Sequence, residues 1–85
     1  MKINATFYSD PGHGWLAVKR HILEQLHLLH RISTYSYQRG ATVYLEEDCD
    51  ASLFLSIARH FGEVNITDKF TDKRSPIRSY DSFHP

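Results

Sequence analysis

The segment YSDPGHGW places Asp10 three residues before His13 and sets a glycine on each side of that histidine. A histidine held by an aspartate is the arrangement that general base catalysis uses. The intervening Pro11 and Gly12, however, follow the order typical of a type II turn. Because no GxSxG or HExxH motif accompanies the pair, we interpret the segment as a turn that joins two strands.

Cys49 is the second candidate for chemistry, because a thiolate at the start of a helix can act as a nucleophile. Its neighbours in the sequence EEDCD are acidic, and their negative charges disfavour the thiolate. We therefore predict a small, partly buried structural thiol rather than a catalytic one. As the one cysteine of the chain it cannot form an intramolecular disulfide, which fits a reducing compartment.

Glu24, His27 and His30 repeat at intervals of three residues. On a continuous helix this spacing would bring the three side chains into one arc of the surface. Zinc needs three or four ligands that converge on one point, with further groups that support them. We interpret the set as a solvated helix face, and we expect no metal ion and no cofactor.

The charges of the chain balance, with ten Lys and Arg residues against ten Asp and Glu residues. That balance argues against a general duplex-binding protein, since neutralising phosphates demands a basic excess. The charges are nevertheless segregated along the sequence, because EEDCD is acidic and the segment Lys69–Arg78 is basic. Such bipolarity favours oriented docking on a protein or on RNA.

Two segments combine the residue types that anchor interfaces. KRSPIRSY interleaves basic, apolar and aromatic residues, and the hairpin predicted over residues 32–47 carries tyrosines with an arginine near its tip. Tyrosines on an exposed sheet can stack on bases, although cross-strand tyrosine pairs also stabilise a hairpin by themselves and no RNP-like motif is present. The residues that we predict to contact a partner are Tyr37, Arg39, Lys73, Arg74, Arg78 and Tyr80.

Alternation of apolar and polar residues predicts the strands that must position these side chains. It runs through residues 2–9 and, after the DPGHG turn, through residues 15–18, which together indicate a β-hairpin. Residues 32–47 indicate a second hairpin, with Arg39-Gly40 at the turn, where a positive φ angle is needed.

The C-terminal third of the chain predicts one more strand and then an irregular tail. Residues 63–70 alternate, and we expect Val64, Ile66 and Phe70 to face inward. Pro76 disfavours another central strand. The remaining residues are expected to add at most a short edge strand before the chain frays.

A change of the hydrophobic period to 3.6 residues predicts two helices. The first is expected to end near His30 or Arg31. The second begins at the sequence DCDA, where Asp48 or Asp50 would cap it, and ends at Gly62. Its inward-facing residues are expected to be Leu53, Phe54, Ile57, Ala58 and Phe61.

The predicted order is β-β-α-β-β-α-β, with room for one further strand. A chain of 85 residues forms one domain, and we expect a single α+β domain over residues 1–85. Its sheet should be antiparallel or mixed, with both helices packed on one face. The first ten residues lack the apolar run of a signal peptide, and no stretch reaches the eighteen apolar residues that cross a bilayer. We therefore expect a cytoplasmic protein without membrane contacts.

Three segments, SDPGHGWLAV, SYQRGATVYLEEDCDASLF and RSPIRSYDSF, resemble a group of small uncharacterised proteins carried by bacteriophages, prophages and plasmids. The resemblance covers most of the chain. It implies a mobile element as the owner and the bacterial cytoplasm as the setting, and it assigns no catalytic role to any position. Compact α+β proteins of such origin often bind and block host machinery, including CRISPR effector complexes, which is an analogy between classes.

Together these features favour a non-enzymatic interaction protein. The first hypothesis is an inhibitor, similar to anti-CRISPR proteins, that occludes a surface of a bacterial defence complex or of another host protein or ribonucleoprotein. The alternative is an accessory module that binds RNA or single-stranded nucleic acid. A small hydrolase that uses His13 or Cys49 is the third. A second copy of the chain is a further candidate partner, because a domain of this size has only a modest core.

Overall fold

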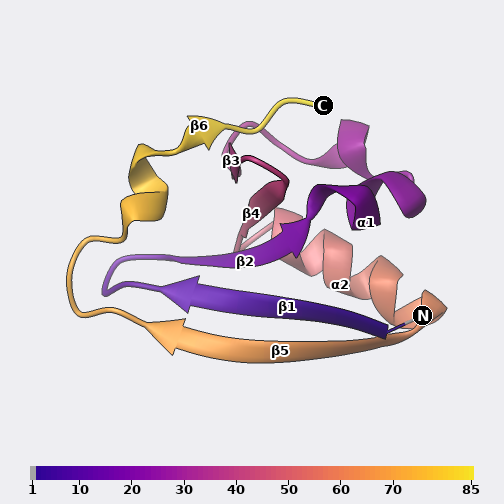
Figure 1. Ribbon diagram of the computed structural model, residues 1–85, viewed down its shortest axis with the longest axis horizontal. Helices are drawn as coiled ribbons and strands as arrows, with labels where there is room; N and C mark the ends of the chain where they lie inside the picture. Colours follow the sequence, from indigo (N-terminus) through magenta and orange to yellow (C-terminus); the bar gives the residue numbers. More distant parts are fainter. Residues whose placement is uncertain (1) are drawn as a thin grey trace.

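The computed structural model describes residues 2–85 and folds them into a six-stranded sheet with two α-helices and two short 3-10 helices (Figure 1). This succession of strands and helices confirms the predicted order and the α+β class. The strands are β1 (Lys2–Ser9), β2 (Gly14–Lys19), β3 (Tyr37–Arg39), β4 (Thr42–Glu46), β5 (Glu63–Phe70) and β6 (Asp81–Ser82). The helices are α1 (Arg20–Gln25) and α2 (Asp50–Phe61), and the 3-10 helices are η1 (Leu29–Arg31) and η2 (Pro76–Ser79).

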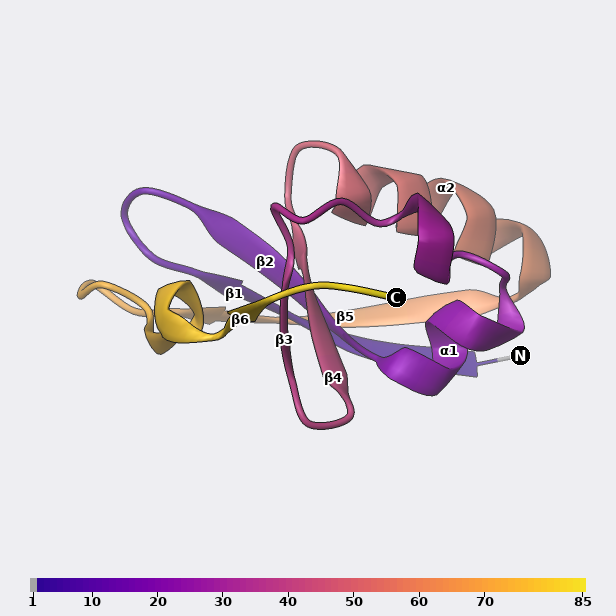
Figure 2. The ribbon, with the colours of Figure 1, turned by 90° about the horizontal axis from the view of Figure 1, so that it is seen from above.

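The sheet is mixed, with the strand order β5-β1-β2-β4-β3-β6. β5 runs parallel to β1, and the other neighbouring pairs are antiparallel. Gly40 and Ala41 join β3 to β4, and Gly40 has φ 58°, a left-handed value that glycine adopts freely, so the predicted turn is confirmed. The sheet twists strongly, and β3 and β4 cross the direction of β1 and β5 (Figure 2).

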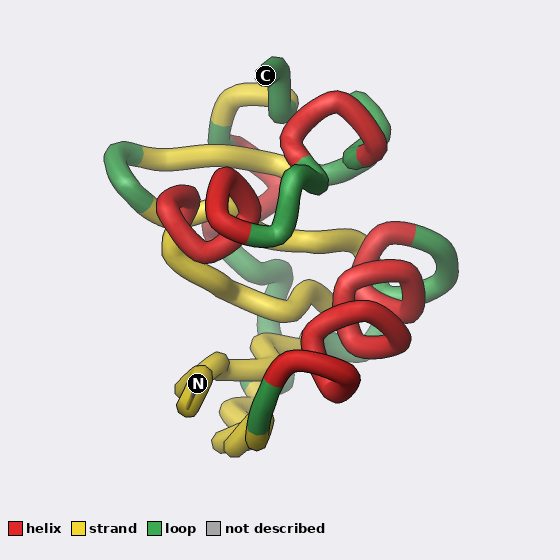
Figure 3. The backbone as a smooth tube through the Cα atoms, turned by 90° about the vertical axis from the view of Figure 1, so that its right-hand side faces the viewer, coloured by secondary structure: helices red, strands yellow, loops and turns green. Residues whose placement is uncertain are grey.

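One face of the sheet carries the hydrophobic core and both helices, as predicted. The pairing register sets Leu16 on β2 between Phe7 on β1 and Leu45 on β4. Leu23 from α1 and Phe54 from α2 are fully buried in the same hydrophobic cluster. Figure 3 shows from the side how α2 lies against the sheet. We call the opposite face of the sheet the open face.

The first helix is shorter than predicted, because it ends at Gln25 rather than near His30 or Arg31. His27 adopts φ 57°, a left-handed value that is uncommon outside glycine and that stops a helix. The N–H groups of His27 and Leu28 close the Schellman pattern of hydrogen bonds, at 3.0 and 2.9 Å. This ending turns Leu28 into the core, where its burial offsets the less favourable backbone of His27.

The start of α2 is held by Glu46, so the prediction that Asp48 or Asp50 caps this helix is wrong. The Glu46 carboxylate accepts hydrogen bonds from the N–H groups of Asp48 at 3.0 Å, Cys49 at 2.6 Å and Asp50 at 2.8 Å. Burial raises the pKa of the Glu46 carboxyl, but these three donors together outweigh burial and hold the pKa below its ordinary value. The last residue of β4 thus fixes where α2 begins.

Asp50 instead ties α2 to the loop that follows η1. Its Oδ2 accepts hydrogen bonds from the hydroxyl groups of Ser33 and Ser36, both at 2.6 Å, and from the N–H of Ser33 at 3.0 Å. The hydroxyl oxygen of Ser36, which is fully buried, also accepts from the N–H of Glu46 at 3.0 Å. These buried polar groups therefore satisfy one another inside the fold.

The buried face of α2 is rotated relative to the predicted one. Phe54 and Ala58 are fully buried as predicted, whereas Leu53 and Ile57 are only partly buried. Phe61, at the end of the helix, is 62% exposed. The helix therefore faces the sheet along the side that contains Phe54, and the expectation that Phe61 is buried is wrong.

β5 follows Gly62, which ends α2 as predicted, and it forms one edge of the sheet. Of the three side chains expected to face inward, Val64 is partly buried, but Ile66 and Phe70 are 38% and 67% exposed. The expectation for Ile66 and Phe70 is wrong because α2 lies beside the first part of β5 and leaves the rest of the strand uncovered (Figure 1). Alternation distinguishes the two faces of a strand, but it does not say whether another element covers them.

The C-terminal segment packs more closely than predicted. Ser75 Oγ accepts a hydrogen bond from the N–H of Ile77 at 3.2 Å and so caps η2, which begins at Pro76. β6 pairs with β3 and confirms the short edge strand. Phe83 is 1% exposed, and its N–H donates to the carbonyl of Ser36 at 2.8 Å, so the chain is anchored as far as Phe83 instead of fraying.

Candidate functional site

The DPGHG segment is a turn, as predicted, and its aspartate holds the turn together. Asp10 Oδ1 accepts hydrogen bonds from the N–H groups of Gly12 and His13, both at 2.9 Å. The His13 ring has other neighbours: its Nδ1 lies 3.8 Å from Glu47 Oε1, and its centroid lies 5.4 Å from that of Trp15. The Asp10 carboxylate thus orients the backbone of the turn rather than the imidazole.

Arg78 joins this turn to the C-terminal segment. Its Nε and Nη2 donate to Asp10 Oδ2 and Oδ1 at 2.8 and 2.9 Å, and the N–H of Ser75 donates to Oδ2 at 2.9 Å. The Arg78 hydrogen bonds are the largest of the causes that hold the pKa of the Asp10 carboxyl well below its ordinary value. The Arg78 guanidinium also lies 5.3 Å from the centroid of the Trp15 ring. The structure therefore uses Arg78, a predicted contact residue, to position the turn.

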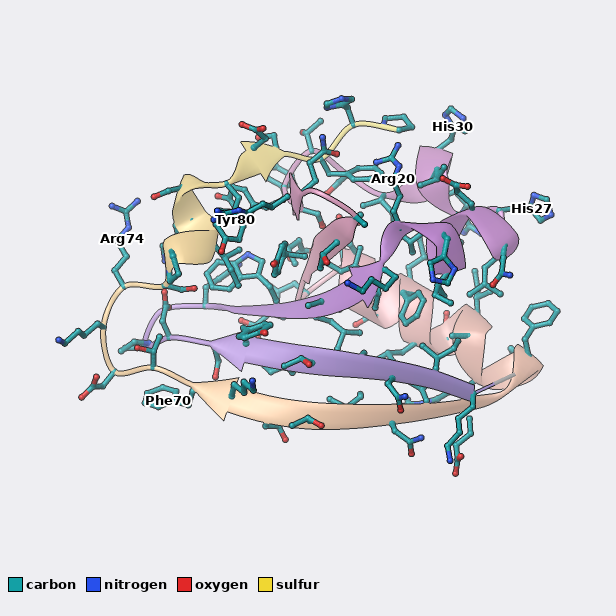
Figure 4. The ribbon with its side chains drawn as sticks, viewed as in Figure 1. Arg20, His27, His30, Phe70, Arg74 and Tyr80 are labelled. Carbon is teal, nitrogen blue, oxygen red and sulfur yellow. The ribbon has the colours of Figure 1, made fainter. Side chains whose placement is uncertain are left out.

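The open face carries a row of aromatic rings with a cation at each end. Tyr44 on β4 lies between Tyr80 and Tyr8, with ring centroids 5.1 and 6.2 Å away. Arg39 lies 4.9 Å from the Tyr80 centroid, and Lys69 lies 6.0 Å from that of Tyr8. Figure 4 shows Tyr80 between η2 and the sheet. We call these five residues the tyrosine row.

The phenol of Tyr44, in the middle of the tyrosine row, has a raised pKa. Burial is the largest cause, and the charges that Tyr80 and Tyr8 would carry if ionised add to it. Tyr44 is therefore neutral at physiological pH and offers both a hydrogen-bond donor and an acceptor beside its ring.

Two recesses adjoin the tyrosine row. One of about 300 Å³ lies between η2 and the ends of β1 and β5, and its walls are mostly aromatic and aliphatic, with Phe70 and Ile77 beside the tyrosines. A second, of about 200 Å³, continues across the open face toward Lys19 and Thr42. The row therefore has space on both sides for a flat apolar group.

Positive charge collects on the open face although the whole chain is neutral. The pairing registers identify which side chains share this face. Among the strand residues of 2–85, its exposed charged side chains are Lys2, Lys19, Arg39, Lys69 and Glu63. Glu46 belongs to the same face, but it is buried and its carboxylate accepts hydrogen bonds from the N–H groups of Asp48, Cys49 and Asp50. Four cations therefore face solvent with one acid, a segregation that the total charge conceals.

Lys73 and Arg74 lie in the loop between β5 and η2. Both are exposed, and neither forms a salt bridge with another residue of 2–85. Arg74 projects from one end of the molecule (Figure 4) and borders a shallow hollow at the turn that contains Asp10. These two cations are thus separate from the tyrosine row.

The structure does not bring the predicted contact residues into one site. They divide into three groups: Arg39 with Tyr80 in the tyrosine row, Lys73 with Arg74 in the loop, and Tyr37 with Arg78 around the buried Trp15. Tyr8, Lys19 and Lys69 were missed, although the alternation of residues 2–9 already separates Tyr8 from the core-facing Phe7. Their grouping depends on strand pairing, which the sequence did not specify.

Glu24, His27 and His30 are exposed, as expected of a solvated surface, but their shared helix face and the partial burial of Cys49 are not found. Because α1 ends before His27, Glu24, His27 and His30 do not share one helix face, and both histidines point away from the sheet (Figure 4). Cys49 is exposed, so the prediction of a partly buried thiol is wrong; its N–H, not its side chain, is fixed by Glu46. Among residues 2–85, no three His, Cys, Asp or Glu side chains are grouped so as to hold a metal ion.

Comparison with other proteins does not extend this description. No protein-family model matches the chain, and no curated protein or solved structure is significantly similar to it. None of the helices within residues 2–85 has the length and hydrophobicity needed to cross a membrane. Fold and site together define a small α+β domain in which helices cover one face of the sheet and tyrosines and cations line the other.

Proposed function

We propose that the protein is a non-enzymatic binding module that holds a single-stranded nucleic acid on its open face, in the cytoplasm of a bacterial cell. The observation that supports this most is the tyrosine row with a cation at each end. Bases stack on aromatic rings and phosphates attract cations, and sheets that bind single strands combine the two. The row supplies both kinds of contact on one face.

The arrangement suits a single strand better than a duplex. The bases of a duplex are stacked on one another and hide their faces, whereas those of a single strand can insert beside Tyr8 and Tyr44. The recesses on either side of the tyrosine row provide the space. Lys19, Arg39 and Lys69 surround these rings at the positions where the phosphates would pass. The neutral total charge limits binding to duplexes of any sequence.

Fluorescence anisotropy with labelled RNA and DNA oligonucleotides tests this proposal directly. With three phosphate contacts and a slope of about −0.7 per contact, the affinity should fall about twentyfold between roughly 50 and 200 mM salt. A duplex of the same sequence should bind more weakly than either single strand. Flat binding curves for both single strands at the lower salt concentration would contradict the proposal.

Variants locate the binding surface. Tyr8→Ala removes one stacking ring and should weaken binding by roughly five- to 150-fold, since stacking contributes about 1–3 kcal/mol per base. Lys69→Ala should reduce the salt slope by about 0.7. Arg59→Ala is the matched control, because Arg59 is an exposed cation on α2, on the covered side of the sheet. Equal losses for Lys69→Ala and Arg59→Ala would show that the open face is not the site.

Lys73 and Arg74 favour a second candidate function, which is inhibition of a host complex. These exposed cations form no salt bridge within residues 2–85, and such cations fit an acidic surface on another protein. The test is a pull-down from a bacterial lysate with the natural chain and with a Lys73→Glu, Arg74→Glu double variant. A specific partner that the double variant loses would support this function. No specific partner, together with unchanged phage growth on hosts that carry defence systems, would contradict it.

A further inference from the structure

Within residues 2–85 the outer edge of β5 is unpaired, and two charged residues of this strand, Glu63 and Lys69, can pair with those of a second copy. We propose that two copies of the chain pair through β5, antiparallel, to form one continuous sheet. β5 is eight residues long, and within residues 2–85 its one neighbour in the sheet is β1. Figure 1 shows it along the outside of the molecule, with no other element across its outer edge. A free edge of this length is a template for another strand.

The hydrogen bonds identify which backbone groups of β5 are free. Thr71, directly after the strand, donates its N–H to the carbonyl of Ser9 at 2.9 Å. Successive residues of a strand point their N–H and C=O groups to alternate sides, so the odd-numbered residues of β5 face β1. The N–H and C=O groups of Val64, Ile66 and Asp68 therefore point away from β1 and toward solvent.

The antiparallel register that we propose uses seven of the eight residues of β5. It sets a twofold axis at Ile66, so that Ile66 meets its own copy and Val64 meets Asp68 of the other chain. If the axis moved to Thr67, Ile66 would oppose a charged Asp68, and Lys69 would oppose Asn65 instead of Glu63. If it moved to Asn65, the pairing would run past the beginning of β5 into the end of α2. The register centred on Ile66 also sets an apolar residue, Val64, against Asp68, but it is the one register that sets Glu63 opposite Lys69.

The same register places opposite charges opposite each other. Glu63 of each chain meets Lys69 of the other, and the twofold axis repeats this pair. Both side chains are exposed and lie on the open face. Directly opposed positions that are not hydrogen-bonded bring side chains closest together, so these pairs attract. Charges on an edge strand usually prevent pairing, whereas here they select a second copy of this chain.

The pairing also covers apolar surface on the side of the helices. Ile66 is 38% exposed and borders a hollow of about 440 Å³ between α2 and β5, which Phe7 and Leu55 also line. In the dimer, each Ile66 would lie against its copy between the two α2 helices. The axis is perpendicular to the sheet, so the open faces of both copies would lie on the same side. The dimer is inferred independently of any ligand of the open face.

Analytical ultracentrifugation of the full chain, without nucleic acid, tests the proposal. We expect a monomer–dimer equilibrium between micromolar and several hundred micromolar protein. Ile66→Pro removes an N–H that points outward and leaves the bonds to β1 intact, so it should abolish the dimer while the circular dichroism spectrum stays unchanged. Asn65→Pro is the contrast, because it removes a bond to β1 and should destabilise the monomer itself.

Charge reversal makes the test specific to the register. Lys69→Glu and Glu63→Lys each turn both attractive pairs into repulsive ones and should raise the dissociation constant by about tenfold or more. Mixing these two single variants restores both attractive pairs, so the mixture should form heterodimers about as well as the natural chain forms dimers. A natural chain that stays monomeric throughout the concentration range would overturn the proposal. So would a dimer that survives Ile66→Pro, or single variants that do not recover on mixing.

Discussion

Replacing Phe83 by alanine should destabilise the fold far more than replacing Phe70 by alanine. The two residues have the same side chain and both lie in the C-terminal third of the sequence. Phe83 is 1% exposed within the core cluster, whereas Phe70 is 67% exposed at the end of β5. The pair therefore isolates burial as the variable. The comparison also distinguishes the observed burial of the two side chains from the prediction made from sequence, in which Phe70 faces inward and the tail frays.

The magnitude follows from the burial of the Phe83 ring. Replacing a fully buried phenylalanine by alanine costs about 3–5 kcal/mol in free energy of unfolding, because it removes apolar contacts and leaves a cavity. The Arg20 guanidinium lies 5.5 Å from the Phe83 centroid, and losing this contact adds about 0.5 kcal/mol. A chain of 85 residues has about 4–13 kcal/mol of total stability. Phe83→Ala should thus remove about a quarter of it or more, and Phe70→Ala less than about 0.5 kcal/mol.

Urea unfolding followed by circular dichroism measures both free energies. Low protein concentration keeps self-association from contributing to the apparent stability. We expect the midpoint of Phe83→Ala to fall with an unchanged slope, which identifies a loss of stability rather than a changed unfolded state. A loss below about 1 kcal/mol for Phe83→Ala would refute the docking of the tail into the core. An equal or larger loss for Phe70→Ala would refute the exposure of the end of β5.

Three further predictions concern acid, backbone packing and the tyrosine row. The pKa values of the Asp10 and Glu46 carboxyls lie below their ordinary 3.8 and 4.5 in the folded chain, so the unfolded chain binds more protons in acid. Stability should therefore be full at neutral pH and fall as the pH drops below about 4.5; an unchanged urea midpoint at pH 3 would contradict this. Gly14→Ala should cost about 1–3 kcal/mol, because its methyl group would overlap the Phe7 ring, and a stability equal to that of the natural chain would show that the ring can move. In an ultraviolet pH titration Tyr44→Phe should remove a phenol that ionises above the ordinary value of 10.0, and loss of a phenol that ionises at or below 10.0 would be inconsistent with the raised pKa.

Local patterns were sufficient to predict most strands and the turns between them. Alternation in residues 2–9 separated Phe7 from Tyr8, and Gly40 marked a turn that requires a positive φ angle. Both signals depend on residues within a few positions of one another. The end of α1 was missed because the left-handed residue there is His27, whereas glycine is the usual sign of such an ending.

Pairings between distant residues could not be predicted from spacing. Asp10 and Arg78 are separated by 68 positions in the sequence. The sequence pattern assigned Asp10 to a turn and Arg78 to a basic segment, and nothing in it linked the two residues. The strand order also depends on residues that are far apart in the sequence. It places Lys69 beside Tyr8 and Ile66 at an exposed edge of the sheet. The candidate site on the open face is formed by this strand order, so it could not be predicted from the sequence.

The core cluster unites Ile3 and Phe83, which are eighty positions apart in the sequence. During synthesis, a nascent chain that has extended only as far as β4 still lacks both the strand that pairs with the outer side of β1 and the ring that fills the core. The hydrophobic core therefore cannot be completed until Phe83 has left the ribosomal exit tunnel. Throughout that interval the chain is open to chaperones and to neighbouring nascent chains on the same messenger.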